Sequence, residues 1–362
     1  MKVVHLVKVE GVGGAEQHLL TLLPELRRRG VDARILSLDA GGDAQRFYDG
    51  LDERAVPWSR VHCGSDVSPR LAGAVTRAVR RERPALLHTH MVHGDVYGSL
   101  AATLLRLPFV SSRHNDDRYL LGPFRHVDRL LMRGVARLIA ISDAVASFVI
   151  RAGLPASRVT TIHYGLDDLP AAPSELTPAD AGIEEGQTLV LAIGRLIEQK
   201  DHATLLRAFA QVYAKHPDTR LAILGWGPLE SETRALAQEL GVEAALTLPG
   251  RVEPRDWLLR ADVFAHSSAW EGFGLVLLEA MLAGLPVAAT AVSAVPEIVT
   301  EETGILVPPG DPERLGEALR TLVADAGLRE RLGAAGRARA HAEFSVGRMA
   351  ERTLAVYERA VA

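Results

Sequence analysis

Several features that would assign this chain to a special class are missing from its sequence. A single cysteine, Cys63, in 362 residues excludes an internal disulfide and is typical of a reducing compartment. No apolar run approaches the roughly 20 residues that a membrane-spanning helix needs. Met1 leads directly into an apolar, strand-like run, so we expect no secretory signal. Together these absences predict a globular protein of the cytoplasm.

The length and the order of apolar segments indicate two α/β domains. A chain of 362 residues, 48% of them hydrophobic, exceeds the usual size of one core and suits two domains of similar size. In the first half, strand-like runs alternate with helical segments and turn residues, which predicts parallel strands in a doubly wound sheet. The strands expected there cover residues 3–9, 33–38, 85–88, 109–113, 138–141 and 159–162.

Charge is divided unevenly along the chain. Residues 1–168 carry 23 Lys and Arg against 18 Asp and Glu, a net of +5, and residues 169–362 carry 18 against 27, a net of −9. Each basic cluster is most simply a solvated helix face. Together, the clusters at 27–29, 77–83 and 125–137 permit peripheral contact with the anionic inner face of a membrane. The lack of interleaved aromatics and the overall charge of −4 argue against nucleic acid.

Two glutamates lie eight positions apart, Glu271 before a predicted apolar helix at 275–283 and Glu279 within it. Glu279 interrupts the apolar pattern, where an ionised carboxylate is costly unless it is hydrogen-bonded. A glutamate at the polar edge of a half-buried helix is the simple alternative. Glu271 is followed by Gly272 and Gly274, which leave room for a ligand near the helix N-terminus, where free N–H groups attract anions.

This arrangement resembles the E-x7-E signature of retaining glycosyltransferases of family 4. The resemblance implies the GT-B fold: two Rossmann-like, doubly wound domains facing each other across a cleft. It implies that Glu271 contacts the sugar of a nucleotide-sugar donor, that the backbone from Gly272 to Leu275, with Phe273 between, faces sugar and phosphates, and that Glu279 holds the ribose.

The similarity extends along the second half of the chain. Gly194, Arg195 and Lys200 follow the expected strand 188–193 and match the family's GRL…KG segment, in which arginine and lysine hold the donor diphosphate; Asp201 replaces the usual glycine. Ser293 and Ala294 likewise stand where two glycines are expected. The resemblance assigns donor binding to Gly13, Gly14, Gly194, Arg195, Lys200, Gly225, Arg251, Glu271, Gly272, Phe273, Gly274, Leu275 and Glu279.

In the first half the matches are looser. The glycine-rich turn 11–16 resembles the family's GGAE loop and lacks the dinucleotide fingerprint, which argues against a nicotinamide dehydrogenase. Tyr164 replaces the asparagine of the family's NG-x-D segment. The resemblance assigns acceptor binding to Glu16, His90 and His114, with His114 also near the donor sugar and the reacting oxygen.

Histidines at 88, 90 and 93, with His114, raise the alternative of a zinc site. No cysteine or carboxylate stands at a usual ligand spacing, so no metal site is expected. For His114 a satisfied polar residue at a domain crevice is the alternative, although a group titrating near neutrality suits a reacting centre.

The sequence therefore predicts a metal-independent, retaining glycosyltransferase without a cofactor. The donor is a UDP- or GDP-linked sugar and the acceptor a hydroxyl of a glycan, a lipid-linked compound or a small molecule. The expected catalytic residues are His114, Glu271, Arg195 and Lys200. A GT-B sugar-nucleotide epimerase and a non-catalytic sugar-nucleotide-binding paralogue remain alternatives.

The expected domains are an acceptor domain at 1–168, a linker at 169–186 rich in Pro, Ala, Glu and Asp, and a nucleotide-sugar domain at 187–344. The last segment, 345–362, is predicted to be a helix that crosses back to the first domain.

Overall fold

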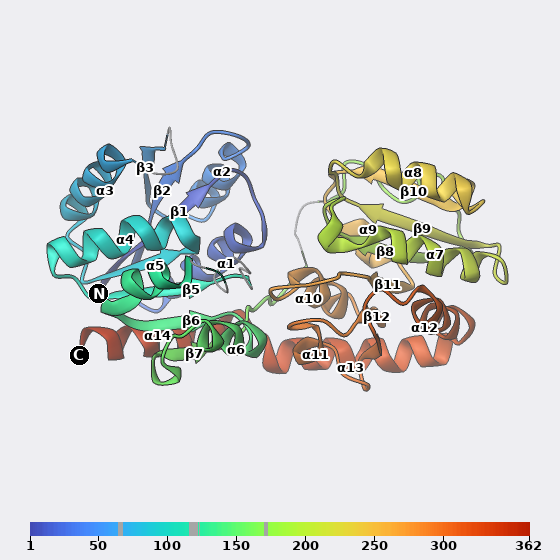
Figure 1. Ribbon diagram of the computed structural model, residues 1–362. Helices are drawn as coiled ribbons and strands as arrows, with labels where there is room; N and C mark the ends of the chain where they lie inside the picture. The colour runs from blue at the N-terminus through green and yellow to red at the C-terminus, as the bar shows by residue number, and fades with distance from the viewer. Residues whose placement is uncertain (64–67, 116–121, 123, 170–172) are drawn as a thin grey trace. The chain divides into compact units, whose positions relative to one another are not determined.

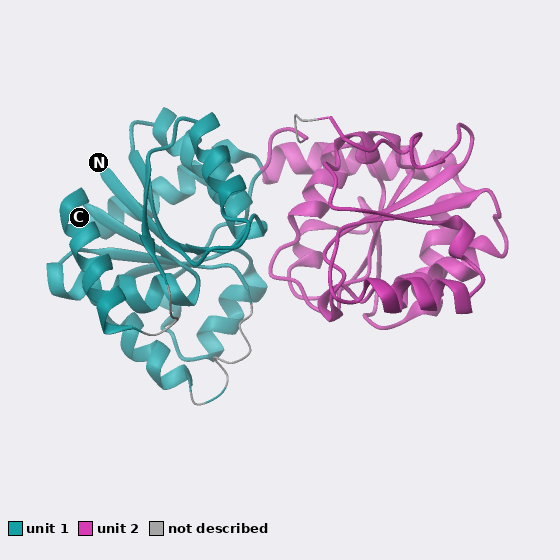
Figure 2. Ribbon diagram, turned by 90° about the horizontal axis from the view of Figure 1, so that it is seen from above, with its two compact units in different colours: residues 1–165, 345–362 teal, residues 166–344 magenta. Residues whose placement is uncertain are grey.

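The computed structural model describes residues 1–63, 68–115, 122, 124–169 and 173–362. These form two compact units (Figure 2): unit 1 comprises residues 1–165 and 345–362, and unit 2 comprises residues 166–344. The first boundary falls three residues before the expected one, because Leu166 N–H donates to the Phe344 carbonyl at 2.8 Å inside unit 2. No helix in these ranges is long and apolar enough to cross a membrane.

Unit 1 is built on a parallel sheet of seven described strands in the order β3-β2-β1-β4-β5-β6-β7 (Figure 1). The central strands β4 and β5 are buried at every residue, as expected where helices cover both faces of a parallel sheet. The strand bounds are β1 (Lys2–Val9), β2 (Asp32–Asp39), β3 (Trp58–His62), β4 (Leu86–His90), β5 (Phe109–Arg113), β6 (Val135–Ala140) and β7 (Val159–Thr161).

The helices of unit 1 form two groups by their contacts. α3, α4 and α5 lie side by side (Figure 1), and α1 packs against both α2 and α14. α14 begins after the cap Ser345 and buries Met349, Val356 and Tyr357, so the last helix belongs to unit 1. The helix bounds are α1 (Gly14–Arg28), α2 (Gln45–Glu53), α3 (Pro69–Glu82), α4 (Met91–Leu105), α5 (Phe124–Leu131), α6 (Asp143–Arg151) and α14 (Val346–Val361).

Unit 2 has a second parallel sheet, of six described strands in the order β10-β9-β8-β11-β12-β13. Apolar residues of these strands pack against the buried faces of α7 and α12, including Leu205, Phe209 and Leu319. The strand bounds are β8 (Thr188–Ile193), β9 (Thr219–Leu224), β10 (Leu246–Gly250), β11 (Val263–His266), β12 (Val287–Thr290) and β13 (Gly304–Val307). The helix bounds are α7 (His202–Tyr213), α8 (Glu230–Glu239), α9 (Arg255–Arg260), α10 (Leu275–Leu282), α11 (Val295–Ile298), α12 (Pro312–Ala324) and α13 (Ala326–Glu343).

The segment expected to be a linker is irregular but fixed to unit 2. Ser174 N–H donates to the Asp256 carboxylate at 2.7 Å, and Trp257 Nε1 donates to the Leu176 carbonyl at 2.8 Å. Buried backbone groups need such partners, so a segment without periodicity can still be held in place. Residues 170–172 of this prediction lie outside the described ranges.

Candidate active site

The two sheets each contain one point where the strand order reverses direction. In unit 2 the chain leaves β8 toward β9 and β10 and later returns on the other side of β8 as β11. Ligands of open parallel sheets bind beyond the carboxyl ends of the strands at such a point. The loops there carry Arg195 and Lys200 after β8, and Glu271 after β11.

Lys200 and Glu271 form a buried ion pair. Lys200 Nζ lies 2.5 Å from Glu271 Oε2, with the two side chains 15% and 11% exposed. His266 Nε2 lies 3.4 Å from the same oxygen. Burial alone would raise the pKa of Glu271, but the Lys200 charge, with a smaller contribution from His266, outweighs it and lowers the pKa to about 2. Glu271 is therefore a carboxylate at any physiological pH.

The two loops are also joined through their backbones. Ala269 N–H donates to the Gln199 carbonyl at 2.8 Å, and Ser267 Oγ donates to the Lys200 carbonyl at 2.8 Å. A Cβ at Gly225 would lie 2.0 Å from the Gly194 carbonyl oxygen, so only glycine permits this approach between the loops after β8 and β9. The predicted residues from separate strands are thereby held at one edge of the sheet.

Two cationic side chains at this edge are exposed. Arg195 makes no ion pair with any residue in the described ranges. Its carbonyl oxygen lies 3.2 Å from His202 Nε2, which holds the backbone beneath the exposed guanidinium. Arg251 lies with its guanidinium 4.7 Å from the centroid of the half-exposed Trp226 ring. The loop that carries Lys200 therefore also exposes the positive charge of Arg195, which no acidic side chain of the described ranges neutralises.

Glu279 lies on α10, which begins after Gly274 at a φ of +96°, a conformation that favours glycine. The carboxyl group is half-buried, and burial, with the nearby charge of Glu253, raises its pKa to about 7. Phe273 is instead part of the core, 2% exposed and in edge contact with Phe344. Only the backbone of Phe273 is therefore suited to the predicted donor contact.

Two of the three positions at which glycine was expected have left-handed backbones, whereas Ala294 is right-handed with a φ of −82°. Asp201 and Ser293 both have φ of +44°, where a side chain is strained. Each side chain makes a compensating bond: the Asp201 carboxylate accepts from Thr204 N–H at 3.2 Å and caps α7, and Ser293 Oγ accepts from Glu271 N–H at 3.3 Å. The geometry explains the glycine preference and how this chain departs from it.

In unit 1 the sheet reverses between β1 and β4, and the predicted residues of the first half lie there. Glu16 Oε2 accepts from Gly13 N–H at 2.9 Å and so caps α1, and Gly14 is its first residue. His90 is fully buried, and His90 Nδ1 lies 3.0 Å from His114 Nε2. His114 Nδ1 bonds in turn to the hydroxyl of Tyr164. Both ring nitrogens of His114 are thus already in use.

The histidines do not gather as the sequence suggested. His93 lies half-buried on α4 and does not belong to the group of His5, His88 and His90, whose ligand atoms lie within 4.8 Å of one another. Each ring nitrogen of these three residues already has a hydrogen-bond partner, which fits neutral imidazoles better than metal ligands.

Sequence reasoning missed three residues of this edge: His5, Tyr357 and His18. His5 was missed because it lies inside the strand β1, where nothing in the sequence sets it apart. Tyr357 was missed because it lies 269 positions from its partner His88. His18, on α1, stacks on Tyr164 with ring centroids 4.3 Å apart, and its Nδ1 has no hydrogen-bond partner within the described ranges. The spacing Glu16 to His18 after the glycine turn was the available signal for His18.

Comparison with known proteins places both halves in one family. The family described as Glycosyltransferase Family 4 matches residues 12–168, and Glycosyl transferases group 1 matches residues 174–339. Phosphatidyl-myo-inositol mannosyltransferase of Mycobacterium leprae is 30% identical over 96% of this chain and 93% of its own length. The chain belongs to glycosyltransferase family 4.

Further relatives agree with this assignment. Alpha-maltose-1-phosphate synthase of Mycolicibacterium smegmatis is 28% identical to the enzyme over 97% of this chain and 96% of its own. The crystal structure of Anabaena HepE in complex with UDP-glucose superposes with a TM-score of 0.84 at 24% identity, covering 98% of this chain and 99% of that one. The predicted GT-B fold is confirmed.

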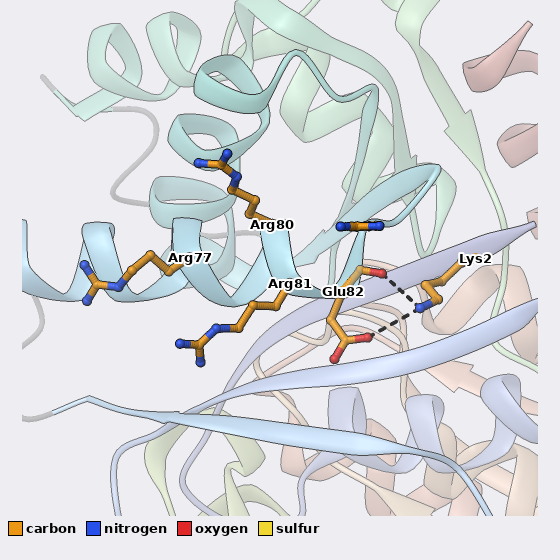
Figure 3. Close-up of a pocket in the computed structure, with 6 residues that line it drawn as sticks. Lys2, Arg77, Arg80, Arg81 and Glu82 are labelled. Carbon is orange, nitrogen blue, oxygen red and sulfur yellow. Dashed lines mark hydrogen bonds and ion pairs between the residues drawn. The ribbon is translucent and has the colours of Figure 1, made fainter.

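The glycosyltransferase carries a separate basic hollow in unit 1 (Figure 3). Lys2, at the start of β1, bonds to Glu82, and four exposed arginines line the same hollow: Arg77, Arg80, Arg81 and Arg83. The adjacent helices α4 and α5 expose apolar side chains, 63% for Leu104, 49% for Phe124 and 58% for Leu130. Basic and apolar groups therefore share the α3–α4–α5 side of unit 1.

Proposed function

We propose that the enzyme transfers a sugar from a nucleoside diphosphate sugar to an acceptor hydroxyl, with retention of anomeric configuration and without a metal ion. Unit 2 binds the donor and unit 1 the acceptor. The observation that carries the proposal is the Lys200–Glu271 pair beside the exposed Arg195, at the strand reversal of unit 2.

The ion pair suits an exchange of partners when the donor binds. A diphosphate brings negative charge that competes with Glu271 for Lys200, while Arg195 supplies a second, unpaired cation. Glu271, released from part of its pairing, can then accept hydrogen bonds from sugar hydroxyls. Charge balance is kept at each stage, so neither carboxylate nor diphosphate is left buried alone.

The remaining donor residues follow from the same geometry. The Glu279 carboxylate, half-buried and without a bond to another described residue, accepts hydrogen bonds from the ribose hydroxyls. The backbone from Gly272 to Leu275 supplies N–H groups at the start of α10, where anions are favoured. UDP-glucose in the HepE complex supports this class of donor.

The chemistry proposed is front-face substitution. The acceptor oxygen forms a bond to the anomeric carbon on the side from which the phosphate oxygen leaves, and that phosphate oxygen takes the acceptor proton. Arg195 and Lys200 stabilise the charge that develops on the leaving diphosphate, which is the part a metal ion would otherwise play. The sequence contains no Asp-x-Asp pattern that would hold such an ion.

We further propose that unit 1 meets an anionic membrane surface through the α3–α4–α5 side. The exposed arginines there match anionic headgroups, and the exposed apolar side chains of α4 and α5 suit the headgroup boundary. A relative named phosphatidyl-myo-inositol mannosyltransferase supports a lipid-linked acceptor.

The decisive experiment is a thermal-shift screen of UDP- and GDP-sugars, followed by turnover assays with candidate acceptors and NMR of the product's anomeric centre. We expect one donor to stabilise the protein and to yield a retained linkage only when an acceptor is present. An inverted product would contradict retention. Release of free nucleotide without any acceptor would favour the epimerase instead.

Membrane contact is measured separately, by co-sedimentation with phosphatidylglycerol vesicles. Leu104→Ser and Phe124→Ser, combined, should reduce binding, while Leu259→Ser, at an exposed leucine of unit 2, serves as the control. Equal binding to neutral phosphatidylcholine vesicles would contradict the proposed headgroup recognition.

A further inference from the structure

A continuous row of hydrogen bonds runs through unit 1 from β5 to the segment after β7. It joins Ser112 to His88 at 2.8 Å and His88 to the Tyr357 hydroxyl at 2.6 Å. It continues from Tyr357 to His5 at 3.4 Å, from His5 to His90 at 3.0 Å, and from His90 to His114 at 3.0 Å, and it reaches Tyr164. We name these seven residues the histidine row.

The row is built from groups that each donate once and accept once. Burial lowers the pKa of His5 and His114 to about 3 and that of His88 and His90 well below the ordinary value, so all four rings are neutral. A neutral imidazole carries one N–H and one accepting nitrogen. Once the nitrogen that carries the proton is fixed in one ring, every following group must donate in the same direction along the row.

Only two proton arrangements therefore satisfy the whole row. In one, every ring from His88 to His114 carries its proton on Nδ1, and His114 donates to Tyr164. In the other, every proton is on Nε2, and Tyr164 donates to His114. A mixed arrangement leaves two donors or two acceptors facing each other. Where the Tyr357 oxygen accepts from both His88 and His5, the mixed arrangement instead leaves the buried Tyr357 O–H without an acceptor in the row. Either fault costs a buried hydrogen bond.

We propose that the histidine row couples the tautomer of His114 to those of His90, His5 and His88, which makes His5, His88 and Tyr357 positioning residues for the site in unit 1. Tyr357 comes from α14, so the last helix of the chain takes part through its hydroxyl as well as its packing. Tyr164, at the other end, stands where the family has asparagine, so the row belongs to this chain's departure from the family pattern. The effect on catalysis rests on the proposed glycosyl transfer.

The test compares two buried tyrosine variants of unit 1. Tyr357→Phe breaks the row in its middle while keeping a fully buried ring, and Tyr48→Phe removes a buried hydroxyl bonded to Ser37 at 2.8 Å outside the row. Nitrogen-15 NMR of the histidine rings reports the tautomer directly. We expect the His114 nitrogen signals to change in Tyr357→Phe and to stay as in the wild type in Tyr48→Phe.

Identical His114 signals in the wild type and Tyr357→Phe would overturn the inference. So would stoichiometric Zn²⁺ in the purified protein, because a metal on His5, His88 and His90 would replace the N–H···N bonds. Should Tyr357→Phe fold poorly, Ser112→Ala opens the row at its β5 end and must also change the His114 signals.

Kinetics separate this inference from the proposed function. With the identified donor, Tyr357→Phe should lower kcat by about tenfold and leave the donor KM within about twofold, and Tyr48→Phe should change neither. An altered tautomer with unchanged kcat would overturn the positioning role, whereas absence of any glycosyl transfer in the wild type would overturn the proposed function and leave the NMR result standing.

Discussion

The carboxyl edges of the two sheets differ in their electrostatics. In unit 2 the loops after β8 and β11 hold charged groups: a lysine paired with a glutamate, and an exposed arginine beside them. In unit 1 His90 ends β4 and His114 follows β5, and burial keeps both rings neutral and bonded to each other.

This difference matches what the proposed function asks of one fold for two substrates. A diphosphate is a strong anion that needs cations and N–H groups, while a hydroxyl is neutral and needs partners that orient it and control its proton. The edge with exposed cations therefore suits the proposed donor and the edge with neutral histidines the proposed acceptor, although both edges lie at the same point of the same topology.

The largest loss of activity is expected when the cations of unit 2 are removed, and this loss tests the role given to the charged edge. Lys200→Ala or Arg195→Ala should each cost about 2–4 kcal/mol of transition-state stabilisation, roughly 30- to 1,000-fold in kcat/KM. Arg234→Ala, which removes an exposed α8 ion pair with Glu230, is the matched control and should leave activity unchanged. Near-wild-type rates in both test variants would remove the diphosphate assignment.

The two glutamates sharpen the comparison within unit 2. Glu271→Gln should lower kcat by about tenfold or more, because charge develops at the sugar during reaction. Glu279→Gln should chiefly raise the donor KM, because the ribose hardly changes between ground and transition states. Saturation kinetics with both variants, alongside melting temperatures, test this. Loss of kcat confined to Glu279→Gln would reverse the two roles.

A smaller effect concerns how stability depends on pH. The pKa of Glu279 is raised to about 7 from an ordinary 4.5, so between these values the folded protein holds a proton that the unfolded chain does not. Stability therefore falls as pH rises through this window, and Glu279→Gln should be about 1–3 kcal/mol more stable than wild type at pH 8 and equal to it at pH 4.5.

The control is Glu271→Gln, whose pH dependence has the opposite sign. The pKa of Glu271 is lowered to about 2, so its stabilising contribution is present above about 4.5 and is lost as pH falls toward 2. Calorimetric melting of both variants at several pH values measures this. A constant difference between Glu279→Gln and wild type at every pH would contradict the raised pKa.

The smallest expected effect is that of a chelator. Because Arg195 and Lys200 are proposed to neutralise the leaving diphosphate, excess EDTA should leave turnover within about twofold. Zn²⁺ and Mg²⁺ added back supply the control. A complete loss of turnover that either metal restores would revive the metal alternative for the histidines.

The sequence predicted the bounds of several strands and helices, because these depend on the local pattern of apolar residues. The apolar runs of β5 and β8 were placed at their observed bounds, and α10 was placed within one residue of its end. The edge strand β3 was missed, since WSRVH has only half-buried and exposed residues and no apolar run. Burial that comes from neighbours on one side alone leaves little trace in a sequence.

The sequence by itself determined the fold class, the family and the charged loops of unit 2, since each of these depends on residues close together in the chain: Gly194 with Lys200, and Glu271 with Glu279. Tertiary structure alone decided which groups meet. Lys200 bonds to Glu271 across 71 positions, and Tyr357 meets His88 across 269. The first pair forms because β8 and β11 are neighbours in a sheet, and the second because α14 packs against β4. The chemistry of each pair exists only once folding has brought its two residues together.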